Sequence, residues 1–387
     1  MVPQVETGLD RLLRSVPGEL RGARVGLLTH AAGIDRAGRS GVDRIAGLSG
    51  LSLVRLLGPE HGLRGEAPAG AAVAHATDPG TGLPVFSLYG APAGSVDPLA
   101  GLDAVLADLQ DAGCRYYTYP GTLRGLVLRA AAAGVPVWVL DRPNPLGGGV
   151  AGPVGVAREL RSLVGCFPVP VRHGLTIGEL ALVAAREEGL ADGAVHVLPV
   201  AGWRRTPFRA WRRPWVPPSP NSTGPEMAEL YPGTCLFEGT NLSEGRGTPY
   251  AFRQVGAPWL DGPRLAAEVR DRLPRGVRAR PVWFLPTESK HAGSVCQGVF
   301  LDLEPGVPRA ADAGLAAGVA LLAAVRAHPA FAWVANGGVH WVDRLTGSGD
   351  LRRAIDADAD VGALLERWRA EAAAWAAARP VDLYPAG

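Results

Sequence analysis

Short apolar runs alternate with stretches of helical spacing in the N-terminal half of the chain, and this alternation restricts the fold more than any other feature. Each run is bounded by turn residues, as buried strands are. Residues 122–134 carry apolar side chains at helical spacing and end at Gly134, the residue type that often closes a helix. A strand–helix–strand order predicts a parallel sheet with helices on both faces, so we expect an α/β fold with a Rossmann-like, mostly parallel sheet. The expected strands cover residues 23–30, 51–61, 83–90, 104–111 and 135–143.

The remaining sequence predicts a smaller second domain. Thr176 and Glu179 are spaced as a capping box at the start of an expected helix, and the proline-rich residues 212–226 predict an ordered loop. We place a Rossmann-like domain at residues 1–248 and an auxiliary α/β domain at residues 249–387. Further strands are expected over 194–203, 277–286 and 297–304, and further helices over 178–189, 263–273, 311–329 and 368–379.

Charge and composition exclude several classes of partner. The formal net charge is +2, from 39 basic and 37 acidic residues that are interspersed, so the chain carries no basic patch for nucleic acid. No apolar run reaches the roughly 18 residues that a membrane span needs, and no signal peptide is visible, so we expect a cytoplasmic protein without a membrane partner. The four cysteines lie far apart and form no CxxC pair, which fits a reducing compartment. We expect a monomer or a homodimer.

Lys290 is the only lysine among the 39 basic residues. Lysine presents a compact ammonium on a flexible stem, whereas arginine presents a rigid planar fork, so the two are not interchangeable where that geometry matters. A functional role for Lys290 and chance retention on a surface loop are both consistent with the composition.

Polar side chains gather at the carboxyl ends of the expected strands or just beyond them. In an open α/β sheet this edge is where ligands bind. No GxGxxG fingerprint follows the first strand and no Walker A loop is present, so the sequence does not predict a nucleotide cofactor. The residues at this edge are Thr29, His30, Glu60, His61, Ser87, Tyr89, Gln110, Asp111, Asp141, Arg142 and Glu238.

The segment CLFEGTNLSEGRGTP, residues 235–249, concentrates charged and amide side chains between glycines. Glycine lets the backbone approach a ligand closely, and polar clusters on loops more often serve binding than packing. Because Glu238 follows two apolar residues, we expect it at the carboxyl end of a buried strand. The alternative is a loop whose hydroxyl and amide groups cap a helix. The candidate residues are Glu238, Asn241, Glu244 and Arg246.

Glu60 is the best single candidate for acid–base chemistry. In GPEHGLRG it follows an apolar run and is surrounded by glycines, although a capping role or an ion pair with Arg64 is the structural alternative. Carboxylates and imidazoles without metal-ligand spacing suggest chemistry on a neutral polar ligand such as a sugar. His30, His61 and His173 show no HxH or HExxH spacing, so no metal site is expected, and His173 also suits a helix entry.

Several co-linear motifs, taken together, resemble the exo-β-N-acetylmuramidases of the NamZ type over essentially the whole chain. The resemblance implies that the Rossmann-like domain is catalytic and that the auxiliary domain closes the active-site cleft. It implies hydrolysis that releases N-acetylmuramic acid from the non-reducing end of peptidoglycan fragments, with a small saccharide as partner and no metal or organic cofactor. It also places Glu60 in the motif of the family's catalytic glutamate. The motifs are LLTHAAGID, LLGPEHGLRG, DPGTGLPVFSLYG, LQDAGCRYYTYPGTL, VLDRPNPLGG, VRHGLTIGELA, PWVPPSPN, YPGTCLFEGTNLSEGRGTP and ESKHAGSVCQGV.

Glycoside hydrolysis needs an acid for the leaving oxygen and a second group that faces the anomeric carbon. We expect Glu60 to be the acid. The sequence leaves the second group open among Glu238, Glu244, Asp111 and Asp141, and the 2-acetamido group of the substrate is a further alternative. Only a cation reads the lactyl carboxylate of muramic acid well, so Lys290, Arg172 or Arg246 is expected to bind it. The other residues expected to contact the sugar are His61, Tyr116, Tyr119, Asp141, Asn144, His173, Asn221 and Asn241.

Two other functions are consistent with the same residues. The first is a non-catalytic protein that binds muropeptides or sugars in the same cleft. The second is a metal-dependent esterase or amidase that would use His30, His61 and His173. Turnover of a muramide substrate distinguishes the first alternative, and insensitivity to chelation excludes the second.

Overall fold

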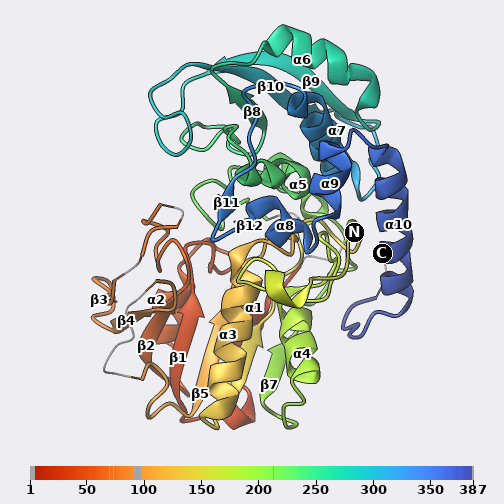
Figure 1. Ribbon diagram of the computed structural model, residues 1–387. Coiled ribbons are helices and arrows are strands. Elements are labelled where there is room, and N and C mark those ends of the chain that lie inside the picture. Colours follow the sequence, from red (N-terminus) through yellow and green to blue (C-terminus); the bar gives the residue numbers. More distant parts are fainter. Residues whose placement is uncertain (1–4, 69, 73, 91–96, 212, 386–387) are drawn as a thin grey trace.

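The computed structural model describes residues 5–68, 70–72, 74–90, 97–211 and 213–385. Its N-terminal part is built on a seven-stranded sheet (Figure 1). The strands are β1 (Arg24–Thr29), β2 (Ser52–Gly58), β3 (Ala76–Thr77), β4 (Pro84–Ser87), β5 (Ala104–Asp108), β6 (Val137–Leu140) and β7 (Val195–Leu198), in the spatial order β3-β4-β2-β1-β5-β6-β7. All neighbouring strands pair in parallel except the edge strand β3, which runs antiparallel to β4. The expected mostly parallel sheet is therefore confirmed.

Helices cover both faces of this sheet, as the alternation of apolar runs predicts. Successive strand residues point to opposite faces, so Leu27 and Leu106 pack with one layer of helices, whereas Leu28 and Val105 pack with the other. The capping box at the start of the fourth helix is confirmed, because the Thr176 hydroxyl accepts from the N–H of Glu179 and the Glu179 carboxylate accepts from the N–H of Thr176. The helices are α1 (Gly8–Arg14) and α2 (Gly41–Ala46) in the first layer and α3 (Thr118–Ala132) and α4 (Ile177–Glu187) in the second.

The C-terminal part has a smaller antiparallel sheet in the order β8-β10-β9. Its strands are β8 (Gln254–Ala257), β9 (Val277–Phe284) and β10 (Cys296–Leu303), and a short pair is formed by β11 (Ala335–Asn336) and β12 (Val339–His340). The expected strands β9 and β10 are confirmed, whereas β8 was not expected. The remaining turns are the 3₁₀ helices η1 (Gly18–Leu20), η2 (Arg158–Leu160), η3 (Phe208–Ala210) and η5 (Arg270–Arg272).

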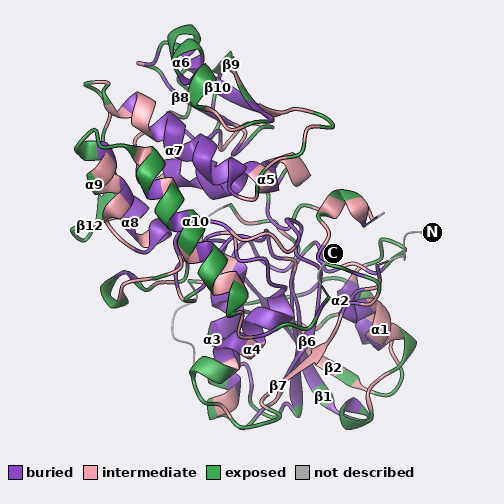
Figure 2. Cartoon of the chain, turned by 90° about the vertical axis from the view of Figure 1, so that its right-hand side faces the viewer, coloured by how far each residue is buried: buried purple, intermediate pink, exposed green. Residues whose placement is uncertain are grey.

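Helices of the C-terminal part pack against this sheet and against each other. They are α6 (Gly262–Val269), α7 (Ala313–Arg326), α8 (Trp341–Thr346), α9 (Asp350–Asp356) and α10 (Val361–Ala377). Figure 2 shows that α7 is buried over most of its length, whereas α10 keeps an exposed face. The expected helices α6, α7 and α10 are confirmed, and α8 and α9 are additional. Among the described residues, no helix combines the length and the apolar character that crossing a membrane requires.

The segment before Glu238 is helical, so the expectation of a buried strand there is wrong. Helix α5 (Pro225–Thr234) runs directly into the 3₁₀ turn η4 (Cys235–Gly239), which contains Glu238. Pro232 lies inside α5, although proline normally interrupts a helix. A Cβ added at Gly233 would lie 1.9 Å from the carbonyl oxygen of Gly314 in α7, so the two helices cross in backbone contact. This tertiary contact overrides the local signal of the proline.

A buried cation joins the two parts of the chain. Arg115 is almost completely buried, and its guanidinium donates to backbone carbonyls of Pro153 and Val169 in the N-terminal part. The same guanidinium donates to the carbonyls of Leu345 and Thr346 at the end of α8. Because a buried donor left without an acceptor costs about 1–3 kcal/mol, these contacts hold α8 firmly against the loop that precedes α3.

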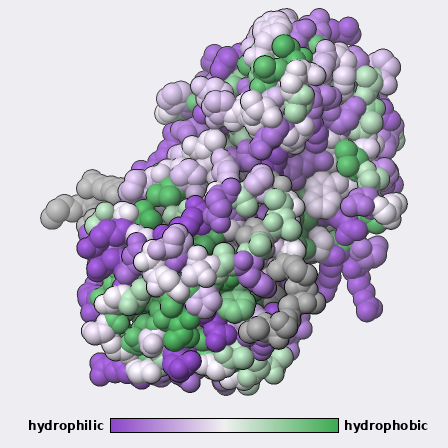
Figure 3. All heavy atoms as spheres, turned by 90° about the vertical axis from the view of Figure 1, so that its left-hand side faces the viewer, coloured by the Kyte–Doolittle hydropathy of each residue, from purple (hydrophilic) through white to green (hydrophobic). Residues whose placement is uncertain are grey.

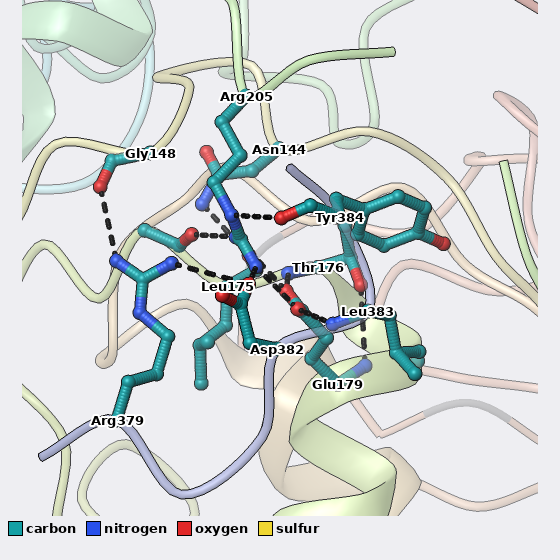
Figure 4. Close-up of polar contacts among 12 residues, drawn as sticks. Asn144, Gly148, Leu175, Thr176, Glu179, Arg205, Arg379, Asp382, Leu383 and Tyr384 are labelled. Atoms are coloured by element: carbon teal, nitrogen blue, oxygen red, sulfur yellow. Dashed lines mark hydrogen bonds and ion pairs between the residues drawn. The ribbon is translucent and has the colours of Figure 1, made fainter. Parts of the chain in front are cut away.

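The C-terminal segment returns to the N-terminal part beyond α10 (Figure 4). The guanidinium of Arg205 pairs with Glu179 in α4 and with Asp382 in this segment. The N–H of Leu383 donates to Glu179 at 2.9 Å, and the carbonyl of Tyr384 accepts from Arg205. The two parts are thus connected at the chain terminus as well as at Arg115.

Candidate active site

A cleft of about 640 Å³ lies at the carboxyl end of β2 and β4, next to the start of α3. Its walls come from both parts of the chain. Figure 3 shows hydrophilic residues gathered where the upper and lower parts of the molecule meet. The cleft therefore occupies the edge of the sheet at which the sequence predicts a ligand site. Its charged lining residues are Glu60, Glu238, Glu244, Arg246, Glu288 and Lys290.

Glu60 follows β2 and lies in the wall of this cleft, with 7% of the residue exposed. The hydroxyl of Thr118, the first residue of α3, donates to one carboxyl oxygen at 2.7 Å. The backbone N–H of Gly70 donates to the other oxygen at 2.8 Å. Both oxygens are thus held from different segments, and the ion pair with Arg64 that was the alternative is absent from the described residues, since Arg64 pairs with Asp78.

The turn after Glu60 depends on two left-handed residues. His61 has φ 72° and Gly62 has φ 79°. A left-handed conformation is uncommon for a residue with a side chain and is retained where surrounding contacts hold it. Here the His61 carbonyl accepts from the N–H of Ala67, and its ring Nδ1 lies 3.0 Å from the carbonyl of Ala67. His61 lines the cleft, and its turn directs Glu60 toward α3.

Glu238 and Glu244 line the same cleft and belong to a chain of alternating charges. Arg246 Nη2 lies 2.6 Å from Glu238 Oε1, and Arg246 Nε lies 3.2 Å from Glu244 Oε1. Lys290 Nζ lies 2.9 Å from Glu244 Oε2, and the indole N–H of Trp341 donates to Glu238 at 3.3 Å. Although burial lowers it, the pKa of Arg246 is raised above its usual value by the carboxylates of Glu238 and Glu244. Arg246 therefore remains a cation.

Tyr89 links the two carboxyl groups electrostatically. It lies just beyond β4 and lines the cleft. Burial raises the pKa of its phenol, and the nearby carboxylates of Glu60 and Glu238 raise it further. The hydroxyl of Ser87 accepts from the N–H of Tyr89 and donates to its carbonyl, which fixes the backbone of this turn. The phenol of Tyr89 therefore keeps its proton at neutral pH. It can donate a hydrogen bond through this proton and accept one at its oxygen.

Residues 218–222 form a further wall of the cleft, which we call the proline-rich wall. The hydroxyl of Tyr119 donates to the carbonyl of Pro218 at 2.7 Å. Burial lowers the pKa of His30 to about 3, so its ring is neutral. The N–H of Gln110 donates to His30 Nε2 at 2.9 Å, and His30 Nδ1 therefore donates to the carbonyl of Pro218 at 3.1 Å. Tyr119 and His30 thus anchor the wall, whose cleft-lining residues are Ser219, Asn221 and Ser222.

Three of the other sequence candidates lie outside the lining of the cleft and are engaged elsewhere. His173 and Asp111 are buried side by side, with His173 Nε2 at 3.0 Å from Asp111 Oδ2. The N–H of Leu175 donates to His173 Nδ1, so the ring proton resides on Nε2 and is donated to Asp111. The guanidinium of Arg172 donates to two backbone carbonyls, and burial lowers its pKa to about 10.

Asp141, Asn144 and Asn241 also lie outside the lining of the cleft. Asp141 is completely buried and accepts two hydrogen bonds of 2.7 Å from the start of α4, and burial raises its pKa to about 7. Asn144, seen in Figure 4, donates to the carbonyl of Leu175 at 2.8 Å. The side chain of Asn241 bonds the backbone of residues 330–332. These polar groups satisfy turns and helix ends, which local spacing alone does not distinguish from ligand contacts.

Several lining residues were not among those expected to catalyse the reaction or to contact the sugar. Tyr89 lies at the end of an expected strand, and this position alone could have identified it as a residue of the binding site. Thr118 and Tyr117 occur in the motif around Tyr116, which also lines the cleft. Nothing in the sequence around Trp341 predicts that it lines the cleft, because it reaches the cleft only through the packing of α8. The histidine cluster of the metal-dependent alternative is not formed, and the residues described contain no group of three His, Cys, Asp or Glu side chains able to hold a metal ion.

Comparison with known proteins gives one consistent result. Two domain families match successive parts of the chain. "Exo-beta-N-acetylmuramidase NamZ, N-terminal" matches residues 25–226, and "Exo-beta-N-acetylmuramidase NamZ, C-terminal" matches residues 229–384. The peptidoglycan β-N-acetylmuramidase NamZ of Bacillus subtilis (strain 168) is 42% identical over 302 residues, which are 77% of this chain and 72% of that protein.

Two solved structures share the whole architecture. One DUF1343 family protein from Bacteroides fragilis NCTC 9343 superposes with a TM-score of 0.84 and 28% identity, over 98% of this chain and 99% of the other. A second protein of the same family and organism has a TM-score of 0.76 and 25% identity, over 99% and 100% of the two chains. The α/β fold with a smaller C-terminal part is thus shared along the full length.

Proposed function

We infer the roles of the cleft residues from one premise: the chain belongs to the NamZ family of exo-β-N-acetylmuramidases and is a glycoside hydrolase. We propose that it releases N-acetylmuramic acid from the non-reducing end of peptidoglycan fragments. The observation that carries this proposal is a sugar-sized cleft that is lined both by Glu60, which follows β2 of the N-terminal sheet, and by Glu238, which follows α5. Two carboxyl groups are what most glycoside hydrolases use.

Glu60 serves as the general acid in this proposal, and Glu238 serves as the second group. Four residues competed for the second role. Asp111 and Asp141 lie outside the lining of the cleft. Glu244 and Glu238 each have partners at both carboxyl oxygens, but the side chain of Glu244 is only 2% exposed. Glu238 keeps 21% of its side chain exposed, which supports its contact with substrate.

Tyr89 completes the proposed catalytic group. Its phenol lines the same cleft, and its pKa is raised by burial and further by the carboxylates of Glu60 and Glu238, so its role in the proposal is that of a neutral hydrogen-bond donor. A tyrosine with a raised pKa retains its proton throughout, so it is not itself the acid or the nucleophile. The 2-acetamido group of the substrate remains the alternative to Glu238 as nucleophile.

The cysteines bear on the compartment in which the reaction takes place. All four cysteines are free thiols, and three of them are buried. Free thiols persist in a reducing environment. We therefore propose that the chain acts inside the cell on recovered wall fragments.

The direct test is turnover of two synthetic substrates, a nitrophenyl β-muramide and the disaccharide N-acetylmuramyl-N-acetylglucosamine. Release of free N-acetylmuramic acid from both, followed by chromatography, is the expected result. A protein that binds the disaccharide in calorimetry but releases no sugar over hours would instead be the non-catalytic binding protein of the first alternative.

Arg246 is the remaining candidate for binding the lactyl carboxylate. Arg172 lies outside the cleft, and the ammonium of Lys290 donates to three protein acceptors. Arg246 lines the cleft and uses Nη2 and Nε in its ion pairs, while Nη1 has no hydrogen-bond partner among the described residues. One charge-assisted hydrogen bond contributes roughly 1.5–3 kcal/mol.

The Arg246→Lys variant is therefore expected to lower the kcat/KM ratio of muramide over glucosaminide by about 10–100-fold. Lysine keeps the positive charge for Glu238 but lacks the second arm of the fork. The ratio is measured with the two nitrophenyl glycosides under identical conditions. An unchanged ratio in an active Arg246→Lys enzyme would assign lactyl recognition to another group.

A further inference from the structure

We propose that Lys290, the only lysine of the chain, is a positioning residue that fixes the carboxylate of Glu238 through Glu244 and Arg246. This inference rests on the proposed role of Glu238. It replaces the expectation that Lys290 binds the lactyl carboxylate of the substrate. Three separate observations support this role of Lys290. They are the contacts of its ammonium group, the chain of charged side chains that begins at this group, and the conformation of the loop that carries it.

The ammonium of Lys290 is fully used by the protein. Nζ donates to the carbonyl of Phe237 at 2.7 Å, to the carbonyl of Leu242 at 2.9 Å and to Glu244 Oε2 at 2.9 Å. An ammonium has three donors and no acceptor, so none remains for a substrate. Phe237 immediately precedes Glu238, and Lys290 therefore fixes the backbone of the turn that carries this carboxylate.

The charge chain extends the effect of Lys290 to the Glu238 side chain. Glu244 bridges Lys290 and Arg246 with its two oxygens, and Arg246 in turn holds Glu238 at 2.6 Å. This row of four charged side chains contains two cations and two carboxylates, so its formal charges sum to zero. Removal of Lys290 would leave a buried carboxylate, Glu244, to compete with Glu238 for the single guanidinium. Glu238 would then be less well oriented.

The loop of Lys290 is held in an uncommon conformation that needs this contact. Ser289 and His291, on either side of Lys290, have φ 65° and φ 58°. Two non-glycine residues in the left-handed region persist only where surrounding contacts fix them. His291 Nε2 lies 2.7 Å from the carbonyl of Asn241, and the N–H of Thr287 donates to the carbonyl of Gly247 at 3.0 Å. The loop between β9 and β10 is thus docked on the segment that contains Glu238, Glu244 and Arg246.

The geometry explains why this position is lysine in a chain that otherwise uses arginine. Two carbonyls and a carboxylate surround one nitrogen atom, which suits the compact ammonium. A guanidinium is planar and spreads its donors over three nitrogen atoms, so it cannot place three hydrogen bonds around one point.

The test compares Lys290→Met and Lys290→Arg with the unchanged enzyme on a nitrophenyl muramide and a nitrophenyl glucosaminide. A misplaced catalytic group costs up to about 10²-fold, so we expect kcat to fall about 10–100-fold on both substrates, with KM and the muramide preference little changed. Lys290→Arg should not restore kcat. Arg280→Met, which removes an exposed cation from β9 in the same hairpin, is the matched control and should retain full activity.

Two outcomes would overturn this proposal. If Lys290→Met loses muramide preference through KM while Lys290→Arg keeps it, Lys290 binds the substrate carboxylate instead. If Lys290→Met retains its kcat, the residue does not position Glu238. Glu244→Gln keeps the shape of its partner and provides a second variant: its effect on kcat should not add to that of Lys290→Met in the double variant. Melting temperatures of all variants show whether each remains folded, and failure of the unchanged enzyme to turn over any muramide would contradict the proposed function rather than this inference.

Discussion

Replacing Glu60 by glutamine is expected to lower turnover of the unactivated disaccharide by about 10²–10⁴-fold, the usual contribution of general acid catalysis. Glutamine keeps the shape of the side chain, its amide oxygen can accept from the N–H of Gly70 and its NH2 can donate to the hydroxyl of Thr118, so the fold and substrate binding should survive. What is lost is the proton for the leaving oxygen. Turnover is measured by the release of free N-acetylmuramic acid, and binding to the folded variant is measured by calorimetry.

The leaving group distinguishes an acid from a nucleophile at this position. Nitrophenolate leaves with little protonation, so Glu60→Gln should slow cleavage of the nitrophenyl muramide much less than cleavage of the disaccharide if Glu60 is only the acid. If both substrates fail alike, Glu60 is the nucleophile. Glu268→Gln, on the exposed face of α6, is the matched control for the same chemical change. Near-normal turnover of both substrates by Glu60→Gln would remove this residue from the mechanism.

Replacing Glu238 by glutamine is expected to have the second large effect, again about 10²–10⁴-fold on kcat. The amide keeps an acceptor for the indole of Trp341 but carries no charge to pair with Arg246 or to stabilise a developing cation at the anomeric carbon. Both the disaccharide and the nitrophenyl muramide should be affected, because the second group acts on the sugar rather than on the leaving group. The measurement is kcat on both substrates at one pH.

A small decrease of kcat in Glu238→Gln would instead indicate that the 2-acetamido group of the substrate acts as the nucleophile. If Glu238→Gln retains turnover within a few-fold, the 2-acetamido group becomes the nucleophile, and an analogue with a 2-hydroxyl group should then not be cleaved by either protein. The anomeric configuration of the released sugar, followed by NMR, separates retention from inversion. Glu244→Gln is compared in the same series, because its carboxylate is the neighbouring alternative.

Local patterns were sufficient for the core of the fold. The strands β1, β2, β4, β5, β6 and β7 and the helices α3, α4 and α7 follow from apolar periodicity and turn residues that act over a few positions. The capping box of Thr176 and Glu179 is likewise local. Because carboxyl ends of parallel strands meet at one edge, the placement of Glu60 at that edge also followed from the sequence.

Long-range contacts decided what local patterns left open. Helix α5 persists through Pro232 because it crosses α7 at Gly233, so Glu238 stands on a 3₁₀ turn and not on a strand. Asp111 and Asp141 stand at strand ends as Glu60 does, yet each points to a buried partner, His173 for the former and the start of α4 for the latter.

The difference between local patterns and long-range contacts also explains why some of the candidate site residues line the cleft while others only stabilise the fold. The sequence by itself determined the sheet, its functional edge, the family and the candidate Glu60. Only the tertiary structure brought Glu238 and Tyr89 into the cleft of Glu60, and only it turned Lys290 toward the protein. The physical reason is that residue type and spacing set where a side chain starts, whereas its direction depends on acceptors and charges that the chain supplies from far away, such as Glu244 for Lys290.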